Sequence, residues 1–269
     1  MVSDFNPRDY LNAACDIARD AGRRILDVYE RGFSVEQKED RSPLTAADRA
    51  AHEIICARLE TLTPGIPVLS EESAKVDYEK RAGWQRFWLV DPLDGTREFI
   101  NRNGEFTVNI ALIENHRPVL GVVYVPVTGL TYFAAAGQGA FKQKGECAVQ
   151  PIKARRFAGG KPIVVASRSH AGPETEVFLK NLGAHDVVSM GSALKLCLVA
   201  EGTADVYPRL GPTMEWDTAA AQCVVEAAGG RVTDLHRQPL AYNKSSLLNP
   251  SFLVIGAGDY DWYRHLPTL

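Results

Sequence analysis

The stretch that decides the fold is Trp88-Leu89-Val90-Asp91-Pro92-Leu93-Asp94-Gly95-Thr96. It begins in an apolar run, residues 87–90, which predicts a short buried strand. We expect the strand to end at Asp91-Pro92, because proline cannot donate to the hydrogen-bond ladder of a sheet. Two carboxylates three residues apart then enter a turn. Such a strand end offers several oxygen ligands, including backbone carbonyls, and hard divalent cations prefer this kind of ligand.

The composition around this stretch is that of an ordinary globular protein. The 269 residues are 45% hydrophobic and 23% charged, which suits one large domain or two coupled ones. A net charge of −3 gives no basic surface for nucleic acid, so we expect no nucleic-acid partner. The sequence shows no signal-peptide pattern and no apolar run long enough for an integral membrane segment. We therefore expect a cytoplasmic protein.

The cysteines point to a reducing compartment. They are odd in number, widely spaced and without a C-x-x-C pair, and four of them lie in helix-like apolar patterns. We expect buried free thiols, with neither disulfides nor a zinc site. The five are Cys15, Cys56, Cys147, Cys197 and Cys223.

The N-terminal half is expected to mix helices with an antiparallel sheet. Capping and turn residues predict helices over residues 6–32 and 45–64. Between them, residues 34–44 are polar and predict a mobile loop, and residues 74–86 form a charged connector. After Thr96, short apolar runs between residues 106 and 142, separated by turn residues, predict an antiparallel meander. The expected strands are 67–69, 87–90, 106–113, 119–125, 130–135 and 140–142.

The C-terminal half has a different pattern. Beyond Gly159-Gly160, strands and helices alternate, which indicates an α/β arrangement. We therefore divide the chain into an α+β half, residues 1–157, which holds the expected metal site, and an α/β half, residues 158–269, which holds the expected substrate site. The overall fold class is α/β. The expected strands are 163–166, 186–189, 204–207 and 252–255, and the expected helices are 174–181, 192–201 and 218–228.

Four acidic residues stand at strand ends or at a helix start. Taken singly, each could be a helix cap or a solvated turn residue; one of them begins a helix and could be its N-cap. Taken together, they would repel one another unless cations lay between them. They are Glu71, Asp91, Asp94 and Asp217.

Two further features complete this acidic set. The backbone carbonyl of Leu93 lies between the two aspartates in sequence and is a candidate ligand, and the Thr96 hydroxyl is placed to orient a water. Asp48 fits a capping box that begins at Thr45. Two cations held by such groups can polarise a phosphoryl group, generate a nucleophilic water and steady the leaving oxygen. The residues therefore predict a two-metal phosphate hydrolase.

Three motifs resemble the signatures of the inositol monophosphatase superfamily. They are Leu69-Ser70-Glu71-Glu72-Ser73, Asp91-Pro92-Leu93-Asp94-Gly95-Thr96 and Trp216-Asp217-Thr218-Ala219-Ala220. The resemblance runs from about residue 10 to residue 255 and implies a layered αβαβα sandwich of the inositol monophosphatase/fructose bisphosphatase type.

The resemblance is closer to the bacterial bisphosphate nucleotidase branch. That branch would remove the 3'- or 2'-phosphate of adenosine 3'(2'),5'-bisphosphate, giving AMP and phosphate in sulfur assimilation and nucleotide recycling. The segments that carry this closer match are residues 97–100, 102–109, 167–170, 194–202 and 207–209.

The resemblance also implies a ligand set for Mg²⁺. Glu71, Asp91 and the Leu93 carbonyl would hold one ion, and Asp91, Asp94 and Asp217 the second. Two ions are implied, or three if the loop around Lys38 takes part; a solvated charge run remains an alternative for Lys38. Inhibition by Li⁺ is expected as well.

The catalytic roles implied by the resemblance fall on three residues. Thr96, with Asp48 behind it, would orient the attacking water, and Glu71 would help to deprotonate it. The amides of Gly95 and Thr96 would face the scissile phosphate. Glu71, Leu93, Asp94 and Asp217 would then also border the substrate.

The remaining substrate contacts are expected in the C-terminal half. Gly191-Ser192 precedes a helix whose N-terminus, with Ser192 as cap, would favour an anion. Lys195 could reach a phosphate as a point charge, or could be an ordinary surface lysine. The resemblance implies that Ser192, Lys195 and Arg209 contact the 5'-phosphate side, while Ser167 and His170 border the nucleotide.

Three alternatives stay open beside this interpretation. An aspartyl-phosphate mechanism of the haloacid-dehalogenase type would need an Asp-x-Asp spacing, whereas Asp91 and Asp94 are separated by two residues. An inositol monophosphatase is the closest rival, and a non-catalytic anion-binding regulator is the third. The expected partner is a small nucleotide bisphosphate, with the protein a monomer or a homodimer. The resemblance also allows peripheral association with the inner membrane.

Overall fold

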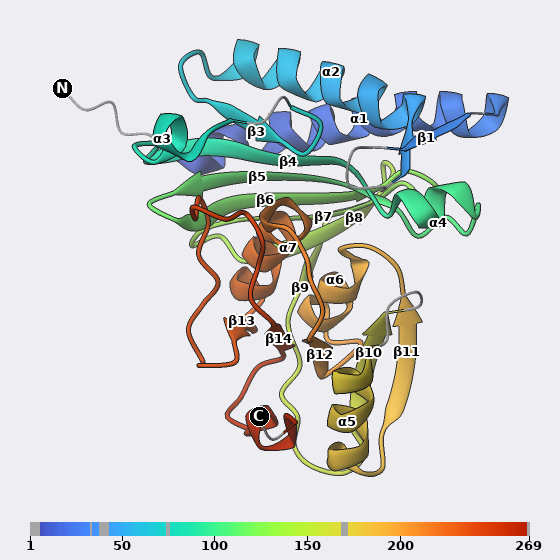
Figure 1. Ribbon diagram of the computed structural model, residues 1–269, viewed down its shortest axis with the longest axis vertical. Helices are drawn as coiled ribbons and strands as arrows, with labels where there is room; N and C mark the ends of the chain where they lie inside the picture. Colours follow the sequence, from blue (N-terminus) through green and yellow to red (C-terminus); the bar gives the residue numbers. More distant parts are fainter. Residues whose placement is uncertain (1–5, 33, 38–42, 74–75, 168–171, 268–269) are drawn as a thin grey trace.

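The computed structural model describes residues 6–32, 34–37, 43–73, 76–167 and 172–267. Two β-sheets alternate with three layers of helices, and Figure 1 shows the resulting five-layer stack. The helices α1 and α2 cover the outer face of a seven-stranded sheet, α6 and α7 lie between the sheets, and α5 covers the far face of a five-stranded sheet. The expected αβαβα sandwich is confirmed.

The outer helical layer begins as the sequence predicts. Asn6 caps a short 3₁₀ turn, η1 (Pro7–Tyr10), which continues into α1 (Leu11–Arg31). α1 ends at Gly32, which has φ 88°. The second helix, α2 (Ala46–Leu62), packs against α1.

The seven-stranded sheet has the order β3-β4-β5-β6-β7-β8-β9. β3 runs parallel to β4, and every later pair is antiparallel, so the expected meander is confirmed. The strands are β3 (Val68–Ser70), β4 (Arg86–Asp94), β5 (Thr107–Glu114), β6 (Arg117–Val125), β7 (Leu130–Ala135), β8 (Ala140–Lys144) and β9 (Gln150–Ile152).

The five-stranded sheet has the order β11-β10-β12-β14-β13, with β10 parallel to both of its neighbours. β13 was missed from the sequence because it is a short strand that directly follows the glycines ending α7. The elements of this half are β10 (Ile163–Ser167), α5 (Pro173–Leu182), β11 (Asp186–Met190), α6 (Leu194–Ala200), β12 (Val206–Arg209), α7 (Glu215–Ala227), β13 (Arg231–Asp234), β14 (Phe252–Ile255) and η2 (Trp262–His265).

The alternation of side chains along β4 builds two cores at once. Trp88 and Val90 pack toward α1 and α2, whereas Phe87 and Leu89 pack into the core that contains α6 and α7. Trp88 is fully buried, and its indole N–H donates to Thr63 Oγ1 at 2.9 Å. Because both faces of the strand are apolar, the sheet is buried between two helical layers.

Two segments expected to be irregular contain regular structure. Around residues 34–44, β1 (Val35–Gln37) pairs with β2 (Pro43–Thr45) in a two-stranded ribbon. The prediction of a loop was therefore wrong for these strands. Residues 38–42 lie outside the described residues. The connector 74–86 contains the single-turn helix α3 (Tyr78–Arg81). These three elements are too short to leave a periodic signal in the sequence.

The expected end of the strand at Asp91-Pro92 was also wrong. β4 continues to Asp94, because a β-bulge between Asp91 and Asp94 accommodates Pro92 without a ladder hydrogen bond. A short helix, α4 (Thr96–Ile100), begins one residue after the glycine that follows the strand.

The five cysteines are free thiols. Cys15, Cys197 and Cys223 are buried as expected, Cys56 is half-buried, and Cys147 is exposed. Among the described residues, no helix has both the length and the apolar character required to cross a membrane.

Candidate active site

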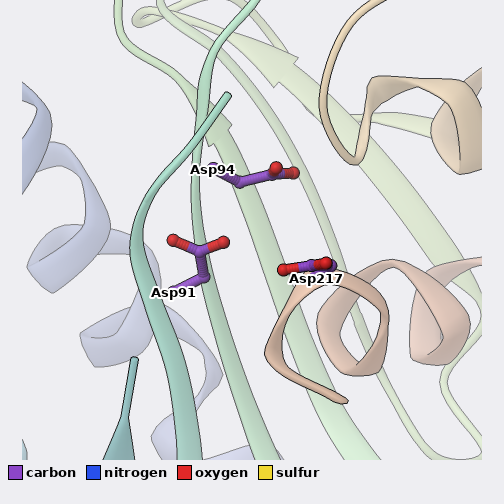
Figure 2. A group of neighbouring side chains, drawn as sticks. All are labelled: Asp91, Asp94 and Asp217. Atoms are coloured by element: carbon purple, nitrogen blue, oxygen red, sulfur yellow. The ribbon is translucent and has the colours of Figure 1, made fainter. Parts of the chain in front are cut away.

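Three carboxylates from two distant parts of the chain meet between the sheets. Asp91 and Asp94 come from the end of β4, and Asp217 comes from the first turn of α7. Each offers a carboxylate oxygen, and these three oxygens lie within 4.8 Å of one another. Figure 2 shows Asp217 extending from its helix toward the end of β4.

The β-bulge explains how one strand presents two carboxylates to the same side. Asp91 pairs with Asn109 and Asp94 with Thr107, so three steps along β4 match two steps along β5. In a regular strand, residues three apart point to opposite faces. The additional residue reverses the alternation: Leu93 packs with Trp88 in the core under α1 and α2, and Asp94 returns to the side of Asp91.

Burial and mutual repulsion dominate the electrostatics of this cluster. Burial, followed by the charge of Glu71, raises the pKa of Asp91 well above its usual range. Burial and the charge of Asp94 raise the pKa of Asp217 to about 8. Hard oxygen ligands in such a group favour a divalent cation, which relieves both penalties. The donor set therefore fits Mg²⁺.

Neighbouring donors fix the orientation of Asp94. Its Oδ2 accepts the Ala193 N–H at 2.6 Å, the Asn109 side-chain amide at 3.3 Å and the Thr107 hydroxyl at 3.4 Å. Burial raises the pKa of Asp94, and the positive charge of Lys195 opposes that rise. Thr107 and Asn109 were not singled out from the sequence, although both lie in the segment 102–109 that carries the family resemblance.

Asp217 takes part in a capping box in addition to joining the acidic cluster. It is the third residue of α7, and its Oδ2 accepts the Met214 N–H at 2.9 Å. The N-cap role that the sequence allowed for Asp217 is wrong, because the N-cap is Met214 and Asp217 completes a capping box from the third position of the helix. This contact leaves the other carboxylate oxygen available to a cation.

Asp48 also has two sets of contacts. Its Oδ2 accepts the Thr45 N–H at 2.8 Å and the Thr45 hydroxyl at 2.6 Å, which completes the expected capping box. Its Oδ1 lies 3.5 Å from the Thr96 hydroxyl, and that hydroxyl lies 3.5 Å from the carbonyl oxygen of Leu93. Thr96 is thus placed between a buried carboxylate and a candidate ligand.

Glu71 lies beside the cluster of three. It follows β3, and its N–H donates to the Val90 carbonyl at 3.1 Å, so the parallel pairing of β3 and β4 brings it to the same sheet end. Its charge raises the pKa of Asp91 and of Asp217.

A cavity of about 220 Å³ opens next to these carboxylates. It is lined by the turn at residues 94–98, by α6 and the two residues before it, by the end of β12 and by the start of α7. Two buried polar atoms of its lining, Ser192 Oγ and Arg209 Nε, have no hydrogen-bond partner among the described residues. Both are donors, and buried donors of this kind suit an anion.

Lys195 supplies positive charge from inside the fold. Its side chain is buried, and the ammonium lies 5.8 Å from the centre of the Tyr207 ring. Burial lowers the pKa of Lys195, while the charge of Asp94 opposes that change. The surface-lysine alternative is therefore wrong: Lys195 faces the cavity.

The expected anion site at a Ser-capped helix N-terminus is not formed. The helix α6 has seven residues and begins at Leu194, and Ser192 lies before it with φ 47°. Close packing leaves no room for a side chain at the preceding Gly191, where a Cβ would lie 2.7 Å from Glu98 Cγ. The Gly191 N–H donates to the Glu105 carboxylate at 2.8 Å. Gly191 is outside the cavity lining, and Ser192 is in it.

The last expected site residues have mixed outcomes. Gly95 lines the cavity and needs its glycine, because φ is 92° and a Cβ would lie 3.3 Å from Ser192 Cβ. Ser167 ends β10. His170 and Lys38 lie outside the described residues.

Comparisons with known proteins agree with this geometry. The sequence profile of the inositol monophosphatase family matches residues 6–262. The chain is 53% identical to the 3'(2'),5'-bisphosphate nucleotidase CysQ of Escherichia coli K12 over 247 residues, covering 91% of this chain and 98% of that protein.

Two solved structures have the same fold. The crystal structure of CysQ from Bacteroides thetaiotaomicron has a TM-score of 0.80 and 49% identity, covering 92% of this chain and 97% of that one. The inositol monophosphatase of Anabaena has a TM-score of 0.77 and 27% identity, covering 97% of each chain.

Proposed function

The chain belongs to the inositol monophosphatase family, and we propose that it is a Mg²⁺-dependent 3'(2'),5'-bisphosphate nucleotidase. The reaction would release the 3'- or 2'-phosphate of adenosine 3'(2'),5'-bisphosphate and leave AMP, in sulfur assimilation and nucleotide recycling. The observation that carries the proposal is one cavity lined both by the basic residues Lys195 and Arg209 and by Asp94 and Asp217 of the acidic cluster. The acidic side of the cavity suits a cation-assisted hydrolysis of one phosphate. The side with Lys195 and Arg209 suits a second anionic group of the substrate.

The metal ligands in this proposal are Glu71, Asp91, the Leu93 carbonyl, Asp94 and Asp217. Two Mg²⁺ ions shared by these groups would polarise the phosphoryl group and lower the pKa of a bound water. Asp91 would contribute to the binding of both ions, and its burial and raised pKa support this role. A third ion near Lys38 remains a prediction.

The water would be oriented by the chain itself. The Thr96 hydroxyl, with Asp48 and the Leu93 carbonyl each 3.5 Å away, is the proposed orienting group. Glu71 is the proposed acceptor of the water proton, because its charge already acts on the cluster. The amides of Gly95 and Thr96, at the start of α4, would face the scissile phosphate.

The 5'-phosphate would bind on the opposite side of the cavity. Lys195 offers a desolvated ammonium, and Ser192 Oγ and Arg209 Nε offer buried donors that lack protein partners among the described residues. Hydrogen bonds to a charged group contribute about 1.5–3 kcal/mol each, so these contacts would favour a bisphosphate over a monophosphate. The proposed roles of Ser167, His170 and Gly191 rest on the resemblance alone.

A phosphate-release assay tests the function. Wild-type protein with Mg²⁺ is compared on adenosine 3',5'-bisphosphate, its 2' isomer, the 3'-phospho-5'-phosphosulfate and inositol 1-phosphate, with Asp94→Asn as the blank. We expect the highest kcat/KM among the nucleotides. A preference for inositol 1-phosphate would make the protein an inositol monophosphatase, and no release from any of them would leave an anion-binding regulator.

Location and assembly also remain proposals. The five free thiols support a reducing compartment such as the cytoplasm. Whether the protein is a monomer or a homodimer stays a prediction, which sedimentation would test. Peripheral membrane association also stays a prediction, which fractionation would test. The boundary at residues 157 and 158 is likewise a proposal, supported by the position of the last strand of one sheet, β9, and the first strand of the other, β10.

A further inference from the structure

A buried carboxylate outside the cavity lies two residues before Asp217. Glu215, the first residue of α7, has no exposed side-chain surface. Its carboxylate accepts the Asn243 N–H at 2.6 Å, the Lys244 N–H at 3.0 Å and the Lys244 ammonium at 2.5 Å. Three donors on one buried carboxylate make a strong charge-assisted cluster, and no step of the proposed reaction uses it.

The loop of residues 242–249 surrounds the first turn of α7. The Glu215 N–H donates to the Leu247 carbonyl at 2.8 Å. The Asn249 side-chain amide donates to the Met214 carbonyl at 2.8 Å and to the Thr218 hydroxyl at 3.0 Å. The residues on both sides of Asp217 are therefore tied to this loop.

The same loop is anchored to the N-terminal half of the chain. Arg81, a buried residue of α3, donates to the Asn243 side-chain carbonyl at 2.9 Å, the Lys244 carbonyl at 2.6 Å and the Ser245 carbonyl at 2.9 Å. α3 directly precedes β4, which carries Asp91 and Asp94. A chain of hydrogen bonds thus connects the two elements that deliver the acidic cluster.

Such a connection is needed because the cluster opposes its own assembly. The charges of Asp91, Asp94 and Asp217 repel one another, and Asp217 is the member carried by a separate element. The repulsion acts to move the first turn of α7 away from β4. We propose that Glu215 is a positioning residue for metal binding, which holds Asp217 within reach of Asp91 and Asp94 through the 242–249 loop and Arg81. This inference rests on the proposed metal site.

To hold the first turn of α7 in place, Glu215 needs its negative charge as well as its shape. A glutamine would keep the volume, but its amide group would face a backbone N–H or the Lys244 ammonium, and one donor would lose its acceptor. The first turn of α7 would then be held less firmly. Loss of supporting contacts around metal ligands costs about 10–100-fold in metal affinity, and because Glu215 acts through the turn we expect about tenfold.

The test measures Mg²⁺ binding directly, by titration calorimetry without substrate. The variants are Glu215→Gln and Lys244→Met, and the matched control is Asp205→Asn. Asp205 is also fully buried, accepts from Arg155 and from the Ile163 N–H at 2.7 Å, and does not line the cavity. We expect the Kd for Mg²⁺ to rise about tenfold in Glu215→Gln and less in Lys244→Met. In Asp205→Asn we expect an unchanged Kd with a lowered Tm.

Two results would overturn the proposal. One is an unchanged Kd in Glu215→Gln; the other is an equal rise in Asp205→Asn, which would reduce the effect to general destabilisation. If Glu215→Gln does not fold, Lys244→Met decides, because its side chain is partly exposed and its loss is mild. Failure of the proposed nucleotidase activity is separate: it would appear as no phosphate release from a wild type that still binds Mg²⁺.

Discussion

Replacing Asp217 by asparagine should make the metal-free protein more stable at alkaline pH. In the folded, metal-free protein the pKa of Asp217 rises from its ordinary 3.8 to about 8. Between those pH values the folded state holds a proton that the unfolded state has lost, so stability falls as pH rises. The contribution is fully present below about pH 4 and is lost through about pH 8.

The size of the effect follows from this pKa. Each pKa unit corresponds to about 1.4 kcal/mol, which gives about 6 kcal/mol for full burial. The Asp217 side chain keeps part of its surface exposed to solvent. Solvent screening therefore reduces the figure to about 3 kcal/mol. Between pH 5 and pH 8 the metal-free wild type should lose about 2 kcal/mol, which lowers Tm by roughly 4–8 °C for a chain of this size.

Thermal unfolding with a chelator at pH 5 and pH 8 measures this contribution. Asp217→Asn keeps an acceptor for the Met214 N–H and removes the part of the loss that belongs to Asp217, so it should exceed the wild-type Tm at pH 8; the raised pKa values of Asp91 and Asp94 leave a smaller pH-dependent loss in the variant. Added Mg²⁺ should raise the wild-type Tm at pH 8 by more than that of the variant, which keeps Glu71, Asp91 and the Leu93 carbonyl but lacks a ligand of the second ion. The reasoning is refuted if the metal-free wild type is as stable at pH 8 as at pH 5, or if the variant unfolds first at pH 8.

Four other changes have defined outcomes. Thr96→Ala should lower kcat at least about 100-fold with little change in KM, because it removes the group that orients the water; steady-state phosphate release measures both constants. Lys195→Met should lower kcat/KM about 30-fold, equivalent to about 2 kcal/mol, for substrates with a 5'-phosphate, and should leave adenosine 3'-monophosphate nearly unaffected. Li⁺ at millimolar concentrations should inhibit by competing at a carboxylate site, and inhibition that extra Mg²⁺ fails to relieve would contradict this explanation. Gly121→Ala should destabilise the fold by about 1–3 kcal/mol, since its Cβ would lie 2.2 Å from the Ala220 carbonyl oxygen; denaturant unfolding tests it.

The sequence predicted that Asp91, Asp94 and Asp217 lie close together, because short motifs carry their identity and spacing. It could not predict that the side chains of Asp91 and Asp94 point to the same side of β4. That direction depends on one additional residue in β4 relative to β5, and proline at position 92 suggested a strand end instead. The pairing partners that define the bulge, Asn109 for Asp91 and Thr107 for Asp94, lie 18 and 13 residues away in the chain, so no local pattern contains them.

Burial was harder to predict for charged residues than for apolar ones. Lys195 lies in the run Leu194-Lys195-Leu196-Cys197-Leu198-Val199-Ala200. The six residues other than the lysine are apolar, and all seven residues are buried. A helix that is apolar on all sides is enclosed by the fold, so this run contained a signal that its lysine was internal. The position of Ser192 carried no such signal, because the neighbours of this turn, such as Glu98 and Glu105 around Gly191, come from the other half of the chain.

The location of the site explains why two halves defined by their sheets need not be independent folding units. The helix that carries Asp217 belongs to the C-terminal half in sequence, yet α7 packs closely on β5 and β6 of the N-terminal sheet. One hydrophobic core contains Leu89 of that sheet, Val224 of α7 and Val254 of the other sheet. Since this core places Asp217 beside Asp91, the energy that opposes charge repulsion in the metal-free protein comes from contacts between the halves. Separated halves would therefore lose metal binding even if each kept its secondary structure.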